Sequence, residues 1–236
     1  MVEQAVDGKK EGTVIPEKEK NKIDVFVDAV KEILGEKLLS IVVYGSILKE
    51  SYIPKKSDIN IVVIVEGLDV SDLLKVKKKL ARFCFKKLIK PFFFTMDFLK
   101  SSADVFPVEW KEIRENHLVV YGKDILGEII LKKQDIRLQL ERDIKQNFIN
   151  FNQGIIFRED VTGLIEESLK SLQIFLRNAK EIITEEIIKP SYIEEIEKWL
   201  KGKRKITKAQ IEEIIQEHLS FLEKLIKLVD REGGNK

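Results

Sequence analysis

The sequence has few of the residues that build disulfides, metal cages or membrane spans. It contains one cysteine and two histidines in 236 residues. A single thiol cannot form an intrachain disulfide, and these three residues do not have the spacing of a thiolate or imidazole metal site. No apolar run approaches the ~20 residues that a membrane span needs, and no signal-peptide pattern opens the chain. We therefore expect a cytoplasmic protein that does not contact a membrane.

The chain also has almost no excess of charge. Its 42 Lys and Arg residues are matched by 40 Asp and Glu residues, so the formal net charge is +2. Proteins that bind nucleic acid through phosphate neutralisation usually have a larger positive excess, so we expect a small partner rather than nucleic acid. The charged fraction of 35%, rich in Lys and Glu beside many Ile, is typical of a thermophile.

The residue pattern changes twice along the chain, which predicts three parts. Residues 1–16 are polar and lack a sustained period, which predicts a flexible arm. Residues 17–130 combine helical periods with short β-branched runs, which predicts an α/β (α+β) domain with a small mixed sheet. Residues 131–236 have a helical apolar period almost throughout, which predicts a bundle of helices.

One stretch of the first domain combines features of an anion site and a cation site. Ile41–Val43 form a β-branched run that ends at Gly45 and Ser46, and residues 59–65 form a second apolar run directly after Asp58. A glycine lets backbone N–H groups approach an anion closely, and a serine hydroxyl can donate as well. A carboxylate at the start of the next strand can then hold a divalent cation beside the anion.

This stretch resembles the nucleotidyltransferase superfamily, which includes polymerase-beta-like enzymes and the kanamycin and streptomycin nucleotidyltransferases. The family signature is an apolar residue, Gly, then Gly or Ser, followed after about a dozen residues by Asp-x-Asp or Asp-x-Glu. In this sequence it stands as Tyr44-Gly45-Ser46 and Ser57-Asp58-Ile59-Asn60. Asn60 replaces the second metal carboxylate. The order of an α/β domain followed by a helical bundle is also similar to the two-domain antibiotic nucleotidyltransferases.

The resemblance implies transfer of a nucleoside monophosphate from a nucleoside triphosphate, such as ATP, to a hydroxyl of a small molecule or protein. The residues that would contact the nucleotide are Gly45, Ser46, Lys55, Lys56 and Ser57. For the two lysines a solvated loop is the competing interpretation. A homodimer is compatible with this architecture.

The resemblance also implies Mg²⁺, or Mn²⁺, as cofactor. Asp58 and Asn60 would share one face of a strand and bind the ion. Because Asn60 has no charge, we expect at most one weakly held ion, and we expect Asn60→Asp to tighten Mg²⁺ binding. The third metal ligand and catalytic carboxylate of the family would be Glu109, on an edge strand over residues 104–110.

Asp104 and Asp97 are the alternatives for the third carboxylate. Glu141, on the first bundle helix, is the candidate general base, although an ion pair with Lys145 four residues later is an equally simple role. A catalytically impaired binding module, such as a nucleotide sensor or an antitoxin-like partner, is the alternative to the enzyme. An ion pair that fills the metal site would favour that alternative.

Two further features have simple structural interpretations. Phe92–Phe94 follow Pro91 and predict a short buried strand, in which core packing is favoured over stacking on a base. His117 and His218 have no second ligand at metal spacing, and we expect packing or surface roles for both.

Overall fold

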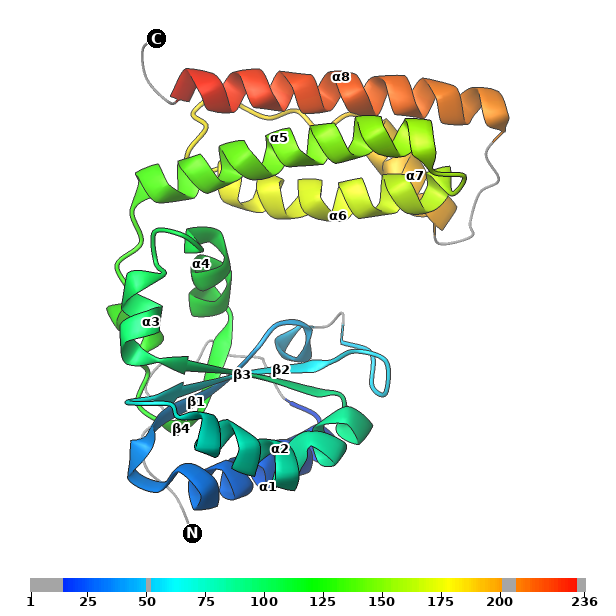
Figure 1. The fold of residues 1–236 in the computed structure, drawn as a ribbon. Coiled ribbons are helices and arrows are strands. Elements are labelled where there is room, and N and C mark those ends of the chain that lie inside the picture. Colours follow the sequence, from blue (N-terminus) through cyan, green and yellow to red (C-terminus); the bar gives the residue numbers. More distant parts are fainter. Residues whose placement is uncertain (1–14, 50–51, 201–206, 233–236) are drawn as a thin grey trace. The chain divides into compact units, whose positions relative to one another are not determined.

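The protein is described by a computed structural model that covers residues 15–49, 52–200 and 207–232 (Figure 1). These residues form two compact units. Unit 1 contains the described residues up to Ala103 together with Glu109–Ile130, and unit 2 contains Asp104–Val108 and the described residues from Leu131 onward. The predicted arm falls almost entirely outside the described residues. The predicted domain limits, 17–130 and 131–236, stay a prediction.

Unit 1 is a four-stranded mixed sheet with helices. Its elements are α1 (Glu17–Leu34), β1 (Leu38–Tyr44), β2 (Ile59–Val65), α2 (Val70–Lys87), β3 (Ile89–Thr95), α3 (Met96–Ser101), most of α4 (Pro107–Glu115) and β4 (His117–Gly122). The strand order is β3-β2-β1-β4. β1 is antiparallel to β2 and β4, whereas β2 and β3 are parallel. The predicted α/β domain with a small mixed sheet is therefore confirmed.

Helices α1 and α2 cover one face of this sheet (Figure 1). Alternate residues of the central strands, among them Ile41 and Ile61, are buried in one core with Phe26 of α1 and Leu80 of α2. Successive side chains of a strand point to opposite faces, so Asn60 projects from the other face. Asn60, and Asp58 two residues before it, therefore lie on the face of the sheet that α1 and α2 do not cover.

The predicted edge strand over residues 104–110 is wrong. The chain forms a turn there, and α4 begins at Pro107. Proline is favoured in the first turn of a helix because its missing N–H has no intrahelical partner at that position. Glu109 therefore lies in the first turn of a helix, not on a strand.

The prediction of a short buried strand at Phe92–Phe94 is wrong in its limits and in its burial. β3 begins at Ile89 and includes Pro91, which the ladder tolerates because β3 lies at the edge of the sheet. Phe92 is 47% exposed.

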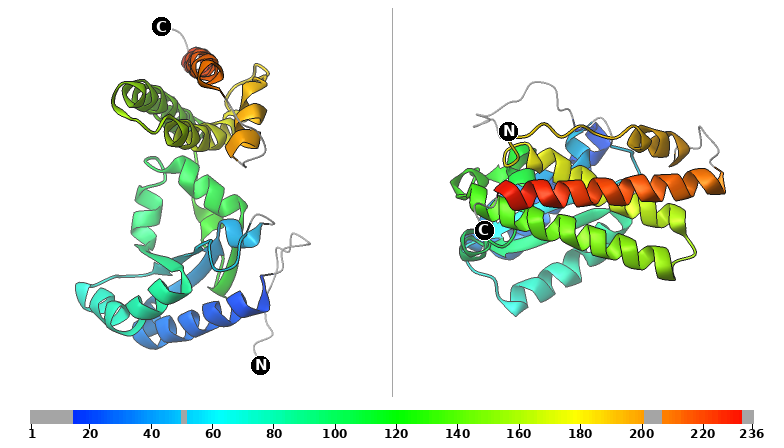
Figure 2. Two further views of the ribbon diagram at one scale, coloured as in Figure 1. Left: turned by 90° about the vertical axis from the view of Figure 1, so that its right-hand side faces the viewer. Right: turned by 90° about the horizontal axis from the view of Figure 1, so that it is seen from above.

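Unit 2 is a bundle of helices, as predicted. It contains α5 (Lys133–Phe157), α6 (Val161–Ala179), α7 (Tyr192–Leu200) and α8 (Lys208–Glu232). α5 packs along both α6 and α8 (Figure 2). Val108 is buried in the same core, and its N–H donates to Gln139 Oε1 at 3.0 Å, which explains why residues 104–108 belong to this unit. No helix in the described ranges is long and apolar enough to cross a membrane.

A buried polar network lies inside the bundle and is centred on His218. His218 Nε2 lies 2.6 Å from Ser168 Oγ, and Nδ1 lies 2.9 Å from the hydroxyl of Tyr192. Ser168 Oγ also donates to Asn147 Oδ1 at 2.8 Å, and the ring of Phe151 packs against the imidazole. His218 therefore has a packing role, one of the two roles expected for it.

Candidate functional site

The sheet brings Gly45 and Asn60 into contact. Tyr44, the last residue of β1, is paired with Asn60 of β2, so the turn after β1 lies beside the start of β2. Gly45 has φ +89°, and a Cβ at this position would lie 3.0 Å from Asn60 Nδ2. Only glycine adopts such a φ at no steric cost. The Gly45 turn and the position of the missing second carboxylate therefore form one site.

The loop between β1 and β2 carries the other predicted nucleotide contacts. Ser46 begins a single 3₁₀ turn, Ser46–Leu48. The Ser57 hydroxyl accepts from the Ile53 N–H at 3.1 Å, which closes the second half of the loop and leaves the hydroxyl proton free to donate. Lys55 and Lys56 are exposed.

Lys90 is the residue of this site that the sequence analysis missed. It is paired with Asn60 in the parallel register of β2 and β3, and its Nζ lies 2.6 Å from Asp58 Oδ2. The side chains of Asp58 and Lys90 are 33% and 61% exposed. An ion pair with this exposure contributes only about 0–1 kcal/mol, so a stronger anion can displace Asp58 from the ammonium group at little cost.

A signal for Lys90 was present in the sequence. A helix between two β-branched segments predicts parallel strands, and the starts of two such strands meet at one edge of the sheet. The strand was expected to begin at Phe92, which left Lys90 outside it. With the strand begun at Ile89, Lys90 would have been placed beside Asn60.

The three candidates for the third carboxylate do not lie on strands. Asp97 is in α3, Asp104 is in the turn after it, and Glu109 is in α4; all three are exposed. In the part of the chain that the structure describes, the four strands contain no Asp or Glu, and no three His, Cys, Asp or Glu side chains form a group that could hold a metal ion.

These residues therefore do not fit the set of carboxylates by which the family holds two metal ions. Asp58 supplies one charge, Asn60 supplies only a neutral oxygen, and Lys90 places a cation where a metal ion would lie. Hard cations such as Mg²⁺ prefer anionic oxygen ligands, and an ammonium group on the same carboxylate opposes their binding. Asp58 and Asn60 can hold at most one ion, in competition with Lys90 for Asp58.

Tyr44 lies next to these groups. It is paired with Asn60 on one side and with His117 of β4 on the other. Burial raises the pKa of its phenol. The hydroxyl of Tyr44 therefore stays protonated at neutral pH and can donate a hydrogen bond.

Glu141 belongs to unit 2 and is fully paired there. Its Oε1 accepts from Lys145 Nζ and its Oε2 from Arg137 Nη1, both at 2.7 Å. The hydrogen bonds from Lys145 and then Arg137 lower the pKa of this carboxyl. A carboxylate held in this state is a weak proton acceptor. The general-base role of Glu141 stays a prediction, and its ion pairs count against it.

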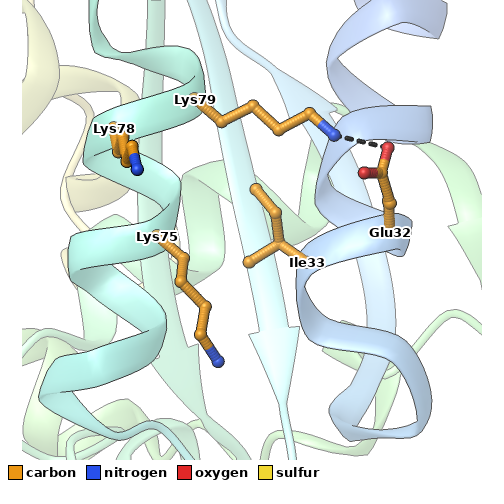
Figure 3. Close-up of a pocket in the computed structure, with 5 residues that line it drawn as sticks. All are labelled: Glu32, Ile33, Lys75, Lys78 and Lys79. Atoms are coloured by element: carbon orange, nitrogen blue, oxygen red, sulfur yellow. Dashed lines mark ion pairs between the residues drawn. The ribbon is translucent and has the colours of Figure 1, made fainter.

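A separate groove lies between α1 and α2 (Figure 3). It is lined by Glu32, Ile33, Lys75, Lys78 and Lys79. Lys79 forms an ion pair with Glu32 across it. Because α1 and α2 cover the opposite face of the sheet from Asn60, this groove is distinct from the predicted site.

Comparison with known proteins identifies the fold. No protein-family model matches the chain, and no curated protein matches it in sequence. Among solved structures it is similar to the spectinomycin adenyltransferase AAD(9) from Enterococcus faecialis, crystallised with ATP and spectinomycin, with a TM-score of 0.53 and 14% identity over 87% of this chain and 98% of that one.

A nucleotidyltransferase-like protein from Exiguobacterium sibiricum also matches 92% of this chain and 77% of its own, at 12% identity, but its TM-score of 0.35 is too low to bear on the fold. The mixed sheet, the turn at Gly45 and the likeness to the adenyltransferase together show that this chain has the nucleotidyltransferase fold.

Proposed function

We propose that this protein binds a nucleoside triphosphate at the Gly45 turn and acts through that binding, as a nucleotide sensor or an antitoxin-like partner, with its transfer chemistry impaired. The observation that carries this proposal is the ion pair between Lys90 and Asp58, directly beside Asn60. The ion pair weakens the attraction for a metal ion and places an ammonium group where it can donate to a phosphate.

The charges around the turn support a polyphosphate ligand. Asp58 is neutralised by Lys90, Asn60 is uncharged, and the exposed Lys55 and Lys56 add two positive charges in the adjoining loop. Hydrogen bonds between ammonium groups and phosphate oxygens are charge-assisted and about twice as strong as neutral ones. The ammonium of Lys90 has three N–H donors, so it can donate to a phosphate oxygen while it stays paired with Asp58, and the triphosphate is then held without a divalent cation.

The second candidate is an enzyme that transfers a nucleoside monophosphate to a hydroxyl of a small molecule or protein. Gly45, Ser46 and Asp58 stand in the order of the family signature, and the similar adenyltransferase was crystallised with ATP and an acceptor. In this candidate Asp58, Asn60 and the phosphate oxygens hold one Mg²⁺ or Mn²⁺, and Glu109 and Glu141 are the further catalytic residues to be tested.

Isothermal titration calorimetry with ATP, in Mg²⁺ and in EDTA, tests the role of Lys90. We expect wild-type affinity to change little on removal of Mg²⁺ and Lys90→Ala to lose about tenfold in EDTA, the scale of one charged hydrogen bond. The matched control is Lys86→Ala, which removes the same charge from an exposed position of α2. ATP binding that disappears in EDTA would contradict the proposal.

Two further variants test whether Lys90 competes with a metal ion for Asp58. We expect Asn60→Asp to tighten Mg²⁺ binding, and Asn60→Asp combined with Lys90→Ala to tighten it further, because the double variant adds a carboxylate and removes the competing ammonium. An unchanged or weaker Mg²⁺ affinity in the double variant would show that Lys90 does not compete with the ion.

Incubation with each labelled nucleoside triphosphate and Mg²⁺ or Mn²⁺ distinguishes the two candidates. For the binding protein we expect neither pyrophosphate release nor self-labelling. If the wild type releases pyrophosphate and Asp58→Ala does not, the protein is the enzyme instead.

A further inference from the structure

The face of the sheet opposite α1 and α2 carries a row of aromatic side chains beside Lys90. Along β3, Ile89 and Phe93 pack into the core under α1 and α2. The alternate residues Lys90, Phe92 and Phe94 therefore project from the opposite face, the face of Asp58 and Asn60. Residues two apart on a strand are separated by about 7 Å, so the ring of Phe92 is the next side chain along the strand from the ammonium group of Lys90.

The row is ordered by direct ring contacts. The rings of Phe92 and Phe94 are nearly parallel, at 3° with centroids 6.2 Å apart, and those of Phe94 and Phe98 are parallel within 5° at 5.2 Å. Trp110 packs edge-on against Phe94 at 5.3 Å, and its indole N–H donates to Ser102 Oγ. Phe94 is therefore held from several sides, and it holds Phe92 in a defined orientation.

Phe92 is the open end of this row. It is 47% exposed, whereas Val62, its partner on β2, is fully buried. A single exposed aromatic ring needs no special explanation. Here, however, the ring is pre-oriented, lies on the face of the predicted site, and neighbours the cation that we expect to hold phosphate. A ligand in which a planar group is linked to a phosphate could therefore contact both the ring of Phe92 and the ammonium group of Lys90.

We propose that Phe92 is the surface on which the base of the bound nucleotide stacks. This inference rests on the proposed nucleotide binding and adds the second contact of the same ligand. A nucleoside triphosphate then binds with its phosphates at Lys90 and the Gly45 turn and its purine or pyrimidine against the ring of Phe92. Because stacking uses the π face that every base has, the site accepts all bases, with a modest preference for purines, whose faces are larger.

Calorimetry with ATP and with inorganic tripolyphosphate tests this proposal, because only ATP has a base. We expect Phe92→Ala to weaken ATP about tenfold, the scale of base stacking, and to leave tripolyphosphate unchanged. Phe92→Trp retains a stacking surface and should keep the ATP affinity. The matched control is Phe85→Ala, which removes an 86% exposed ring from α2 on the other side of the sheet and should change neither ligand.

The outcomes separate this inference from the proposed function. If ATP binds the wild type and Phe92→Ala equally, the base does not stack on Phe92, although nucleotide binding stands. Equal weakening of ATP and tripolyphosphate by Phe92→Ala also overturns the inference, because the ring then acts on the phosphate site. If neither ligand binds the wild type, the proposed function and this inference fail together.

Discussion

The buried imidazole of His218 makes the stability of the bundle depend on pH. His218 is fully buried, and desolvation lowers its pKa from 6.5 to about 4. Ser168 Oγ uses its proton on Asn147, so it accepts from His218 Nε2–H, and the Tyr192 hydroxyl donates to Nδ1. The network satisfies both nitrogens of the neutral ring, whereas protonation would place a charge in the core and require the Tyr192 hydroxyl to turn and accept.

The sign and size of the effect follow from this pKa. Below pH 6.5 the unfolded chain takes up a proton that the native bundle excludes, so the free energy of unfolding falls as the pH falls. The loss is about 1.36 kcal/mol per pH unit and ends near the native pKa of about 4. The interval between 6.5 and about 4 is therefore worth about 3 kcal/mol, with full stability above pH 6.5.

Urea unfolding measured across this pH interval tests the prediction. Far-UV circular dichroism follows the unfolding of the helices, which include all four of the bundle. His218→Gln keeps a donor and an acceptor but cannot titrate, and its stability should fall by about 3 kcal/mol less than that of the parent over the interval. The control His117→Gln retains His218 and should retain the loss. Equal losses in the parent and in His218→Gln would refute the reasoning.

Two further substitutions test the site and the bundle. Gly45→Ala should cost about 1–3 kcal/mol of unfolding free energy, measured in urea, and should weaken ATP, because φ +89° is strained for alanine and its Cβ would displace Asn60. Gly67→Ala, where a Cβ meets nothing within 4 Å, is the control, and equal losses would contradict this reading. Glu141→Gln should lower the stability of the bundle by about 1 kcal/mol or less and leave ATP binding in calorimetry unchanged, because Glu141 pairs with Arg137 and Lys145. A loss of ATP affinity would show instead that Glu141 takes part in nucleotide binding.

Much of the fold could be predicted from local patterns. The β-branched runs at β1 and β2, the glycine between them and the helical period beyond residue 131 follow from side-chain periodicity, which the backbone geometry imposes within a few residues. The same patterns failed over residues 104–110, where Pro107 is compatible with an edge strand and also with the first turn of a helix. Local sequence does not choose between these two, because packing of Val108 in the bundle core decides it.

The sequence by itself determined which groups the site contains: a glycine turn, Asp58, and an asparagine where the family has a second carboxylate. Only the tertiary structure decided what faces them. The register of β2 and β3 sets Lys90 against Asp58 and turns Phe92 toward the same face, because hydrogen bonding between strands far apart in sequence fixes which side chains become neighbours. A sequence motif specifies the residues that it contains, but the charge of the finished site also depends on the strand that pairs with it.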